Sequence, residues 1–398
     1  MIKLNKIAMT CLVLSYVFFT SCEKSEDTKI LNTEVISKDI TSNLTLKNNV
    51  NGVDYIIQGC IELKASAILT IEAGTTIAFT QNSCLEVHEF AAIKAIGTET
   101  NPITFTGEQQ TKGFWDGISF YNTNNQENVL SHCIIEYAGN AKISTASNAR
   151  KAALIIGKEF KDPVRISIDH VTIRHNLNTG LSIYNNAIMN KFEYCQMLDN
   201  QNSILVYDQS IQYMDPFIIA KDNQINNVQW IYNTSSSVVN SVFSIKAIPL
   251  SYQLISSFYK MEAGGKLTIE AGVNLIMSPS SVIYATNGGI IDIKGTSARK
   301  VNLSGEFNTI NYWRGIYADN GGRLNIDHAV IADGGEASTN FGGMVAQSSD
   351  GALYITNSTL SNFLKYGIAY YASKPHNADI ETSNSCSGNT GISCFWKR

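Results

Sequence analysis

Residues 69–74 read LTIEAG, and residues 267–272 read LTIEAG again, 198 positions further along the chain. The same offset relates four more pairs of residues: Gly97 and Gly295, Gly107 and Gly305, Trp115 and Trp313, and Gly117 and Gly315. An unchanged offset over this stretch indicates that one block was copied with hardly an insertion. Self-similarity at a fixed period is typical of repeat proteins, in which each unit buries its apolar face against its neighbours. The sequence therefore predicts a solenoid of two related halves.

Short apolar alternations separated by Gly, Asn or Thr recur along the whole chain. Six of them lie between residues 55 and 105: Tyr55–Ile57, Ile61–Leu63, Leu69–Ile71, Ile77–Phe79, Leu85–Val87 and Ile103–Phe105. Their period of two is typical of strands with one buried face. Three such strands make a coil of roughly 22–26 residues, and the next coil supplies each parallel partner. From residue 44 onward there is room for roughly 14 coils, a rod about 65 Å long at ~4.8 Å per coil.

Asparagine and histidine recur at fixed places in this repeat. Asn176, Asn200 and Asn226 follow successive strands, so their amides are expected to form a hydrogen-bonded ladder from coil to coil. Histidine precedes an apolar strand in a shared pattern at three places: His132, His170 and His328. We interpret these histidines as residues of the repeated frame rather than as metal ligands or acid–base groups. No Cys/His cluster has the spacing of a zinc site, so no metal is predicted.

The first 21 residues have the three parts of an export signal. Lys3 and Lys6 form the positive region, residues 7–19 the apolar region, and residues 20–22 a small-residue cleavage site. The apolar region is too short to span a bilayer comfortably, and no later segment approaches the ~20 residues that a spanning helix needs. The cysteine at the cleavage site, Cys22, resembles the lipobox of bacterial lipoproteins, which implies lipidation of its thiol. An ordinary secretory leader is the alternative.

Acidic residues follow Cys22 and bear on where the protein is displayed. Glu23, Glu26 and Asp27 resemble the surface-export signal of some Gram-negative lipoproteins. Residues 22–43 are predicted to form a polar tether. Acyl chains on Cys22 would anchor it durably, since each buried CH₂ contributes ~0.8 kcal/mol. We therefore expect an exported outer-membrane lipoprotein exposed at the cell surface, with a periplasm-facing placement as the alternative.

Four segments in a fixed order carry a resemblance to a known family. They are LTIEAGTTIAF at 69–79, GTETNPITFTG at 97–107, FWDGISF at 114–120, and a histidine strand ending EYAGN at 136–140. This order resembles the right-handed parallel β-helix surface lipoproteins of Gram-negative bacteria, which have a pectin-lyase-like fold. The resemblance implies an all-β, right-handed parallel β-helix over residues 44–240 and 241–398, the second half ending in a cap. It implies no single activity, because the superfamily mixes lyases, glycosidases and adhesins.

Charge and cysteine content narrow the possible partners and redox states. The formal net charge is −4, and no basic stripe is present, so nucleic-acid binding is not expected. Cys386 and Cys394 enclose a short turn-rich loop and are a possible disulfide at the end of the chain. Cys60 and Cys84 lie one coil apart, within disulfide range, but in-register neighbours on parallel strands have poor torsion geometry. We expect the latter two to be buried free thiols.

Carboxylates and basic groups near the middle of the chain are weak candidates for catalysis. Asp208 and Asp215 form the pair to test for hydrolysis, which needs two carboxylates ~5 to ~9 Å apart across a cleft. Arg174 and His175 are the candidates for a lyase, because the resemblance implies a basic proton-abstracting residue. A compact Asp cluster that could hold calcium beside Arg174 is absent, as are Ser-His-Asp elbows, P-loops and dinucleotide motifs. We predict no catalytic residue and no cofactor.

Four tyrosines give the sharpest binding hypothesis. Each ends a predicted strand and is followed by Asn or Asp: Tyr121, Tyr184, Tyr207 and Tyr232. Period two turns Tyr121 and Tyr184 outward, where exposed aromatics would stack on sugar rings. Tyrosine is also a common strand residue on a wet face, so a scaffold role is the alternative. Trp115 and Trp313 are expected to pack at coil corners, and residues 140–151 and 336–350 to form protruding loops.

These observations predict a lipid-anchored cell-surface β-helix that binds glycan or contacts other surface molecules without catalysis. The alternative is a polysaccharide lyase or glycoside hydrolase that acts in a groove of the β-helix. A purely structural spacer is the third possibility. The expected partners are a polysaccharide or cell-surface glycan, and the membrane through Cys22.

Overall fold

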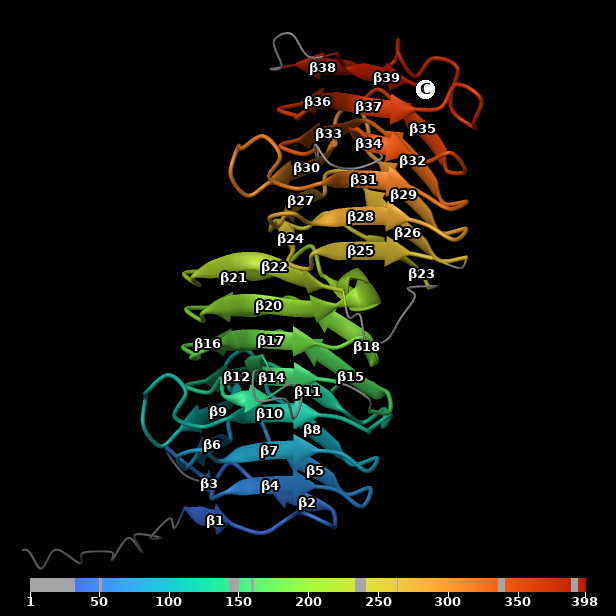
Figure 1. The fold of residues 1–398 in the computed structure, drawn as a ribbon. Coiled ribbons are helices and arrows are strands. Elements are labelled where there is room, and N and C mark those ends of the chain that lie inside the picture. The colour runs from blue at the N-terminus through green and yellow to red at the C-terminus, as the bar shows by residue number, and fades with distance from the viewer. Residues whose placement is uncertain are drawn as a thin grey trace, which may run out of the picture. The chain divides into compact units, whose positions relative to one another are not determined.

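The computed structural model describes residues 33–49, 52–142, 150–158, 161–232, 241–262, 264–335, 341–387 and 393–398, which belong to one compact unit, Thr33–Arg398. The predicted leader and Cys22 lie outside these residues. The unit is an all-β, right-handed parallel β-helix of about 13 turns (Figure 1). Within the described ranges one short helix occurs, η1 (Asp208–Tyr213), and no helix is long and apolar enough to cross a membrane.

Three stacks of parallel strands form the first half. An eight-stranded sheet consists of β1 (Glu34–Ile36), β3 (Tyr55–Ile57), β6 (Thr76–Phe79), β9 (Ile103–Gly107), β12 (Cys133–Glu136), β16 (Thr172–Arg174), β19 (Gln196–Leu198) and β21 (Ile219–Lys221). A six-stranded sheet consists of β2 (Leu44–Leu46), β5 (Ile68–Ile71), β8 (Ala92–Ile96), β11 (Val129–Ser131), β15 (Val164–Asp169) and β18 (Ala187–Glu193). The third stack is β4 (Cys60–Leu63), β7 (Cys84–Val87), β10 (Gly117–Phe120), β14 (Lys151–Ile156), β17 (Thr179–Ile183), β20 (Asn202–Tyr207) and β22 (Ile225–Ile231).

The second half repeats this plan. The third stack continues through β24 (Tyr252–Leu254), β27 (Asn274–Met277), β30 (Val301–Gly305), β33 (Ala329–Ala332), β36 (Thr359–Ser361) and β38 (Ser385–Ser387). With β13 (Ala141–Lys142), which pairs with β14 beside the stack, these strands form one fourteen-stranded sheet. A five-stranded sheet consists of β23 (Val242–Ile245), β26 (Lys266–Glu270), β29 (Ile290–Lys294), β32 (Arg323–Asp327) and β35 (Ala352–Thr356). A second six-stranded sheet consists of β25 (Phe258–Met261), β28 (Val282–Ala285), β31 (Gly315–Ala318), β34 (Gly343–Gln347), β37 (Tyr366–Tyr370) and β39 (Phe395–Lys397).

At the junction between the two halves, two of the three sheets end and two new sheets begin. The eight-stranded sheet ends at β21 and the first six-stranded sheet at β18, while new sheets begin at β23 and β25. Among the described strands, only the pairing of β22 with β24 carries a sheet across this junction. Strand β9 lies in the eight-stranded sheet, but its repeat equivalent β30 lies in the fourteen-stranded one. The copied sequence therefore builds the same coil in both halves while its strands extend different sheets.

The core is a column of apolar side chains from the inward positions of each strand. On β9, Ile103 and Phe105 point inward and are fully buried, whereas Thr104 and Thr106 lie on the outer face. Phe105 stacks in register between Ile77 and Ile135 of the adjacent coils. Full burial of each such side chain contributes ~1.5–3 kcal/mol, so each coil is stabilised mainly by the coils beside it.

Asparagines form the expected ladder at one corner, with one correction. Asn176 Nδ2 donates to Asn200 Oδ1 at 2.9 Å, and Asn200 Nδ2 donates to Asn223 Oδ1 at 3.0 Å. Asn223, not Asn226, is thus the third member, and Asn226 accepts a hydrogen bond from Asn223 at the end of the ladder. Asn223 keeps the spacing at which Asn202 pairs with Ile225, whereas Asn226 lies within the register shift that follows, before Val228.

Left-handed corners explain the repeated histidines and one repeated glycine. His132, His170 and His328 have φ of 48°, 51° and 49°, just before β12, β16 and β33, which supports their interpretation as frame residues. Gly117 has φ of 135°, and a Cβ there would lie 2.4 Å from the Ala153 carbonyl oxygen. Only glycine fits so close an approach of two coils.

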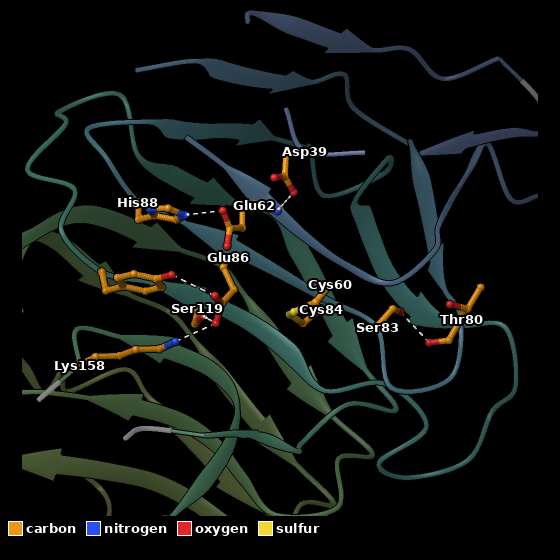
Figure 2. Close-up of a disulfide and its surroundings, with 11 residues drawn as sticks. Asp39, Cys60, Glu62, Thr80, Ser83, Cys84, Glu86, His88, Ser119 and Lys158 are labelled. Atoms are coloured by element: carbon orange, nitrogen blue, oxygen red, sulfur yellow. Dashed lines mark hydrogen bonds and ion pairs between the residues drawn. A yellow bond between two sulfur atoms is a disulfide. The ribbon is translucent and has the colours of Figure 1, made fainter. Parts of the chain in front are cut away.

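Two disulfides occur among the described residues. Cys386 and Cys394 are joined, with Cα atoms 5.6 Å apart. Cys60 and Cys84, which we expected to be free thiols, are also joined, because register places them side by side on β4 and β7 with Cα atoms 4.3 Å apart (Figure 2). Cys60 is moreover exposed, contrary to the expected burial. The buried free thiols are instead Cys133 and Cys195.

The two predicted loops differ from expectation. At the first, β13 (Ala141–Lys142) pairs antiparallel with β14, and residues 143–149 lie outside the described part of the chain. At the second, residues 336–340 are likewise outside it, but β34 occupies Gly343–Gln347. The prediction of a loop over all of 336–350 is therefore wrong, because buried Met344, Val345 and Ala346 continue a stack between β31 and β37.

Candidate functional site

Two rows of side chains run along the outer face of the eight-stranded sheet. Strand register aligns the first row: Thr76, Thr104, Ile134, Thr172, Gln196 and Ile219. The second row begins with Ile56, Ala78 and Thr106 and continues with Glu136, Arg174, Leu198 and Lys221. Residues far apart in the sequence thus become neighbours one coil apart. The face is mostly uncharged at its amino-terminal end and charged further along.

A hollow of about 790 Å³ opens over the amino-terminal end of this face, and we call it the threonine groove. Hydroxyl groups of Thr76, Thr104 and Thr106 lie along its floor. Amides and carboxylates form its rim: Asn48, Asn101, Gln110, Glu108 and Glu136. Among the described residues that line it, Glu108 and Glu136 are the only charged ones. The groove therefore offers many hydrogen-bonding groups and no cation.

Glu136 is held firmly at the edge of the groove. Thr106 Oγ1 donates to its Oε1 at 3.0 Å, and Arg174 Nε donates to its Oε2 at 2.8 Å. The indole Nε1 of buried Trp115 donates to the Glu136 backbone carbonyl at 2.9 Å. Arg174, a candidate lyase base in the sequence, is thus the ion-pair partner of a nearly buried carboxylate.

A second hollow of about 370 Å³ adjoins the threonine groove and shares Pro102 with it. Thr172 and Gln196 lie in its lining, and a ladder of stacked rings borders it. The ladder is made of four rings on successive coils, with centroids 4.6, 4.8 and 4.9 Å apart: His132, His170, Tyr194 and Phe217. Because each ring covers the face of the next, the inner rings present their edges to solvent. Phe217, 58% exposed, ends the ladder.

Two histidines of this ladder and a neighbouring aspartate bring possible metal ligands close together. Within the described residues, His132, Asp169 and His170 bring possible ligand atoms within 4.8 Å of one another. The two imidazole planes are within 12° of parallel, so their in-plane lone pairs do not converge on one point. Asp169 already contacts His170 Nδ1 at 2.8 Å and Lys191 Nζ at 3.1 Å. The arrangement is that of a stacked corner held by ion pairs.

At the other end of strands β16 and β19, the chain segment that follows β9 contacts the residues that come directly after these strands. Lys112 Nζ reaches Asp199 Oδ1 at 2.7 Å, and His175 Nδ1 contacts Asp199 Oδ2 at 2.8 Å. Tyr137 stacks on the His175 ring at 5.7 Å between centroids. Lys112 and His175 lower the pKa of Asp199 through these hydrogen bonds. His175, the second candidate for a lyase base, therefore lies in an ion-paired corner rather than beside a substrate cleft.

The predicted ladder of exposed tyrosines is wrong for three of its four members. Tyr184, Tyr207 and Tyr232 are 4%, 9% and 7% exposed. Tyr184 and Tyr207 lie on the outer face of their sheet, as period two requires, but pack there into a small second core with Ile155 and Ala141. Tyr232 packs against Tyr259 in the main core. No sugar ring can reach these buried aromatic faces.

Tyr121 is half-buried, and other side chains occupy both sides of its ring. The His88 ring stacks 5.0 Å from it, and Lys158 Nζ lies 4.2 Å from its centroid. Its hydroxyl donates to Glu86 at 2.9 Å, and Glu86 is also ion-paired to Lys158 at 2.8 Å. Figure 2 shows Glu86, His88 and Lys158 gathered beside the disulfide. Burial would raise the pKa of Glu86, but the Lys158 contact lowers it below its usual value.

Asp208 and Asp215 are buried residues with structural partners. Asn185 Nδ2 donates to Asp208 Oδ2 at 3.2 Å, and Asp215 Oδ2 accepts the Tyr194 backbone N–H at 2.7 Å. Their exposed fractions are 2% and 6%, and neither lines the threonine groove. The groove itself was missed in the sequence. Its signal was the alternation Ile103 to Thr106, which turns two hydroxyls outward beside those of neighbouring coils.

Fold and site together define a class: a parallel β-helix with an open, polar groove on the outer face of one sheet. Residues 38–146 match the family model described as a pectate-lyase-like beta helix domain. This stretch includes β2 to β13 and the whole threonine groove. No curated protein and no solved structure matches the chain.

Proposed function

We propose that the protein is a non-catalytic surface module that binds a neutral polysaccharide in the threonine groove. The observation that carries the proposal is the lining of that groove: hydroxyls on the floor, amides at the rim, and no Lys or Arg among the described lining residues. Such groups match the alternating donors and acceptors of sugar hydroxyls. The groove is open and runs along stacked strands, which suits a polymer chain rather than a small enclosed ligand.

Charge argues for a neutral rather than an acidic chain. Glu108 and Glu136 are the charged groups of the lining, and both repel carboxylate or sulfate substituents. The Arg174 guanidinium, the nearest cation of the second row, is already paired with Glu136. A polyuronate would therefore meet the carboxylate of Glu108 and find no available cation among the described lining residues.

A glycoside hydrolase is the second candidate, because two carboxylates line the same hollow. Binding without hydrolysis is favoured because both carboxylate oxygens of Glu136 already accept hydrogen bonds, from Thr106 and Arg174. A reducing-end assay on each polysaccharide that binds separates the two. New reducing ends that disappear in Glu108→Gln would establish hydrolysis instead.

Replacing Thr104 by Arg is expected to abolish binding of neutral polysaccharide, because the long cation fills the floor of the groove. The measurement is a glycan array followed by titration with the best neutral ligand, and the expected loss is at least tenfold. Thr268→Arg is the matched control, since Thr268 lies half-buried at the centre of an outer strand face beside Asp292. Unchanged binding in Thr104→Arg, or an equal loss in both variants, would end the proposal.

The proposal also places the protein on the outer membrane, held by lipid at Cys22 and displayed outward. Its support is the leader pattern and the acidic residues after it. Cells grown with a labelled fatty acid are expected to label the protein, and Cys22→Ser is expected to lose both the label and membrane association. Protease added to intact cells should degrade it. Labelling that persists in Cys22→Ser would rule out this anchor.

A further inference from the structure

The second half has a hollow at the place that corresponds to the ring-bordered hollow of the first half. It measures about 380 Å³ and is lined by residues that include Ser297, Lys300, His328, Thr359 and Ser385. His328 occupies the corner position of His132, and Thr359 pairs with Ser385 as Thr172 pairs with Gln196. The duplication has thus produced two hollows on one plan.

The two hollows differ in charge. Two residue differences between them both make the second hollow more positive. The repeat offset relates Glu99 of the first hollow to Ser297 and Pro102 to Lys300. The second hollow therefore loses a carboxylate and gains an ammonium group. Its described lining residues include no Asp or Glu. Among the described residues, Lys300 has no ion-pair partner, so its charge is available to a ligand.

Neighbouring groups hold the histidine in place. Asp327 Oδ1 lies 2.9 Å from His328 Nδ1 and accepts hydrogen bonds from Asn357 Nδ2 at 2.8 Å and Thr356 Oγ1 at 2.9 Å. Two hydrogen-bond donors and the imidazole of His328 thus surround this one carboxylate oxygen. Hydroxyls of Thr359 and Ser385 lie 3.4 Å apart within the lining and can turn toward an acceptor.

We infer that this second hollow binds an anionic sugar unit, whose charged substituent contacts Lys300 and His328 and whose hydroxyls contact Thr359 and Ser385. The inference is independent of the threonine groove, which lies in the other half and has carboxylates in its lining. Hydrogen bonds that involve a charged group are the stronger ones, so the charged substituent should dominate affinity.

Dextran sulfate and unsubstituted dextran are the probes, with the full-length protein titrated at low and physiological salt. We expect dextran sulfate to bind and dextran not to bind at this site. Lys300→Gln is expected to weaken dextran sulfate binding about tenfold, as for loss of one charge-assisted hydrogen bond. Lys260→Gln is the control, because it removes the same charge from a half-buried lysine on β25 in another sheet. Equal loss in both variants, or no binding of dextran sulfate, would overturn the inference.

Two further arms sharpen this result. Thr104→Arg should leave dextran sulfate binding unchanged, so failure of the threonine groove and failure of this site are distinguishable. Polygalacturonate tests whether a carboxylate can replace the sulfate group. If polygalacturonate binds and its binding also depends on Lys300, the site accepts any anionic sugar. If polygalacturonate does not bind, the site is restricted to sulfate esters. Thermal melting of Lys300→Gln should match that of the unmodified protein, since Lys300 is half-exposed.

Discussion

Asn200→Ala is expected to destabilise the β-helix by about 4 kcal/mol, because one side chain satisfies several buried groups at once. Its Oδ1 accepts from the backbone N–H and Nδ2 of Asn176, at 3.2 and 2.9 Å. Its Nδ2 donates to the Ile173 carbonyl and to Asn223 Oδ1, both at 3.0 Å. Alanine leaves these partners without water in a corner where Asn200 is 2% exposed. Each buried group left unsatisfied costs ~1–3 kcal/mol.

The matched control is Asn226→Ala, the same change at the exposed end of the same ladder. There water can replace the lost acceptor, so the cost should stay near 1 kcal/mol. Denaturant unfolding gives both values, and hydrogen exchange should show increased opening in the coils of β16, β19 and β21. A loss of less than about 1 kcal/mol in Asn200→Ala would mean that stacked apolar side chains alone define this corner.

The asparagine ladder shows which features of the fold could be predicted from the sequence and which could not. Spacing of Asn176 and Asn200 predicted a stacked pair, because each coil returns to the same corner after a nearly constant number of residues. The third member could not be identified, because Asn223 and Asn226 both follow Asn200 by about one coil and spacing alone does not choose between them. The choice depends on strand register, which pairs Asn202 with Ile225 and so aligns Asn200 with Asn223.

The tyrosines show a different limit. Period two correctly put Tyr184 on the outer side of β17, away from Ile183 in the core. Exposure, however, depends on what covers that face, and here Tyr207, Ile155 and Ala141 pack against it. Local alternation contains no information about such a second layer. The threonine groove is hidden for a related reason: its hydroxyls are adjacent only after the coils have stacked.

The duplication could be recognised in the sequence because identical segments recur at one offset. It correctly predicted that both halves are built from the same kind of β-helical coil. It did not predict that β30 would join the fourteen-stranded sheet while β9 lies in the eight-stranded one. The sheet that each strand joins depends on how the chain runs through the junction between the two halves. The repeated segments do not specify the path of the chain at that junction.

Trp115→Ala is expected to cost about 4 kcal/mol of stability and also to weaken polysaccharide binding. The indole is fully buried, stacks 3.8 Å from the Phe79 ring, and donates from Nε1 to the Glu136 carbonyl at 2.9 Å. Alanine removes the ring contact, leaves a cavity behind β6 and frees the backbone of Glu136, which forms part of the groove rim. Denaturant unfolding and titration with the neutral ligand measure the two effects separately.

The duplicated residue provides the control for this double effect. Trp313 is equally buried and donates from Nε1 to the Ala332 carbonyl at 2.7 Å, but it lies in the second half, away from the threonine groove. Trp313→Ala should therefore destabilise by a similar amount while the surviving folded protein binds neutral polysaccharide normally, because solenoid coils interact chiefly with their neighbours. If both variants lost binding equally, the damage would be spreading along the whole β-helix, and the groove could not be assigned to the coils around Trp115. If only Trp115→Ala lost binding, the binding site would be assigned to the coils around Trp115. The loss could not then be explained by reduced stability, because Trp313→Ala is destabilised by a similar amount.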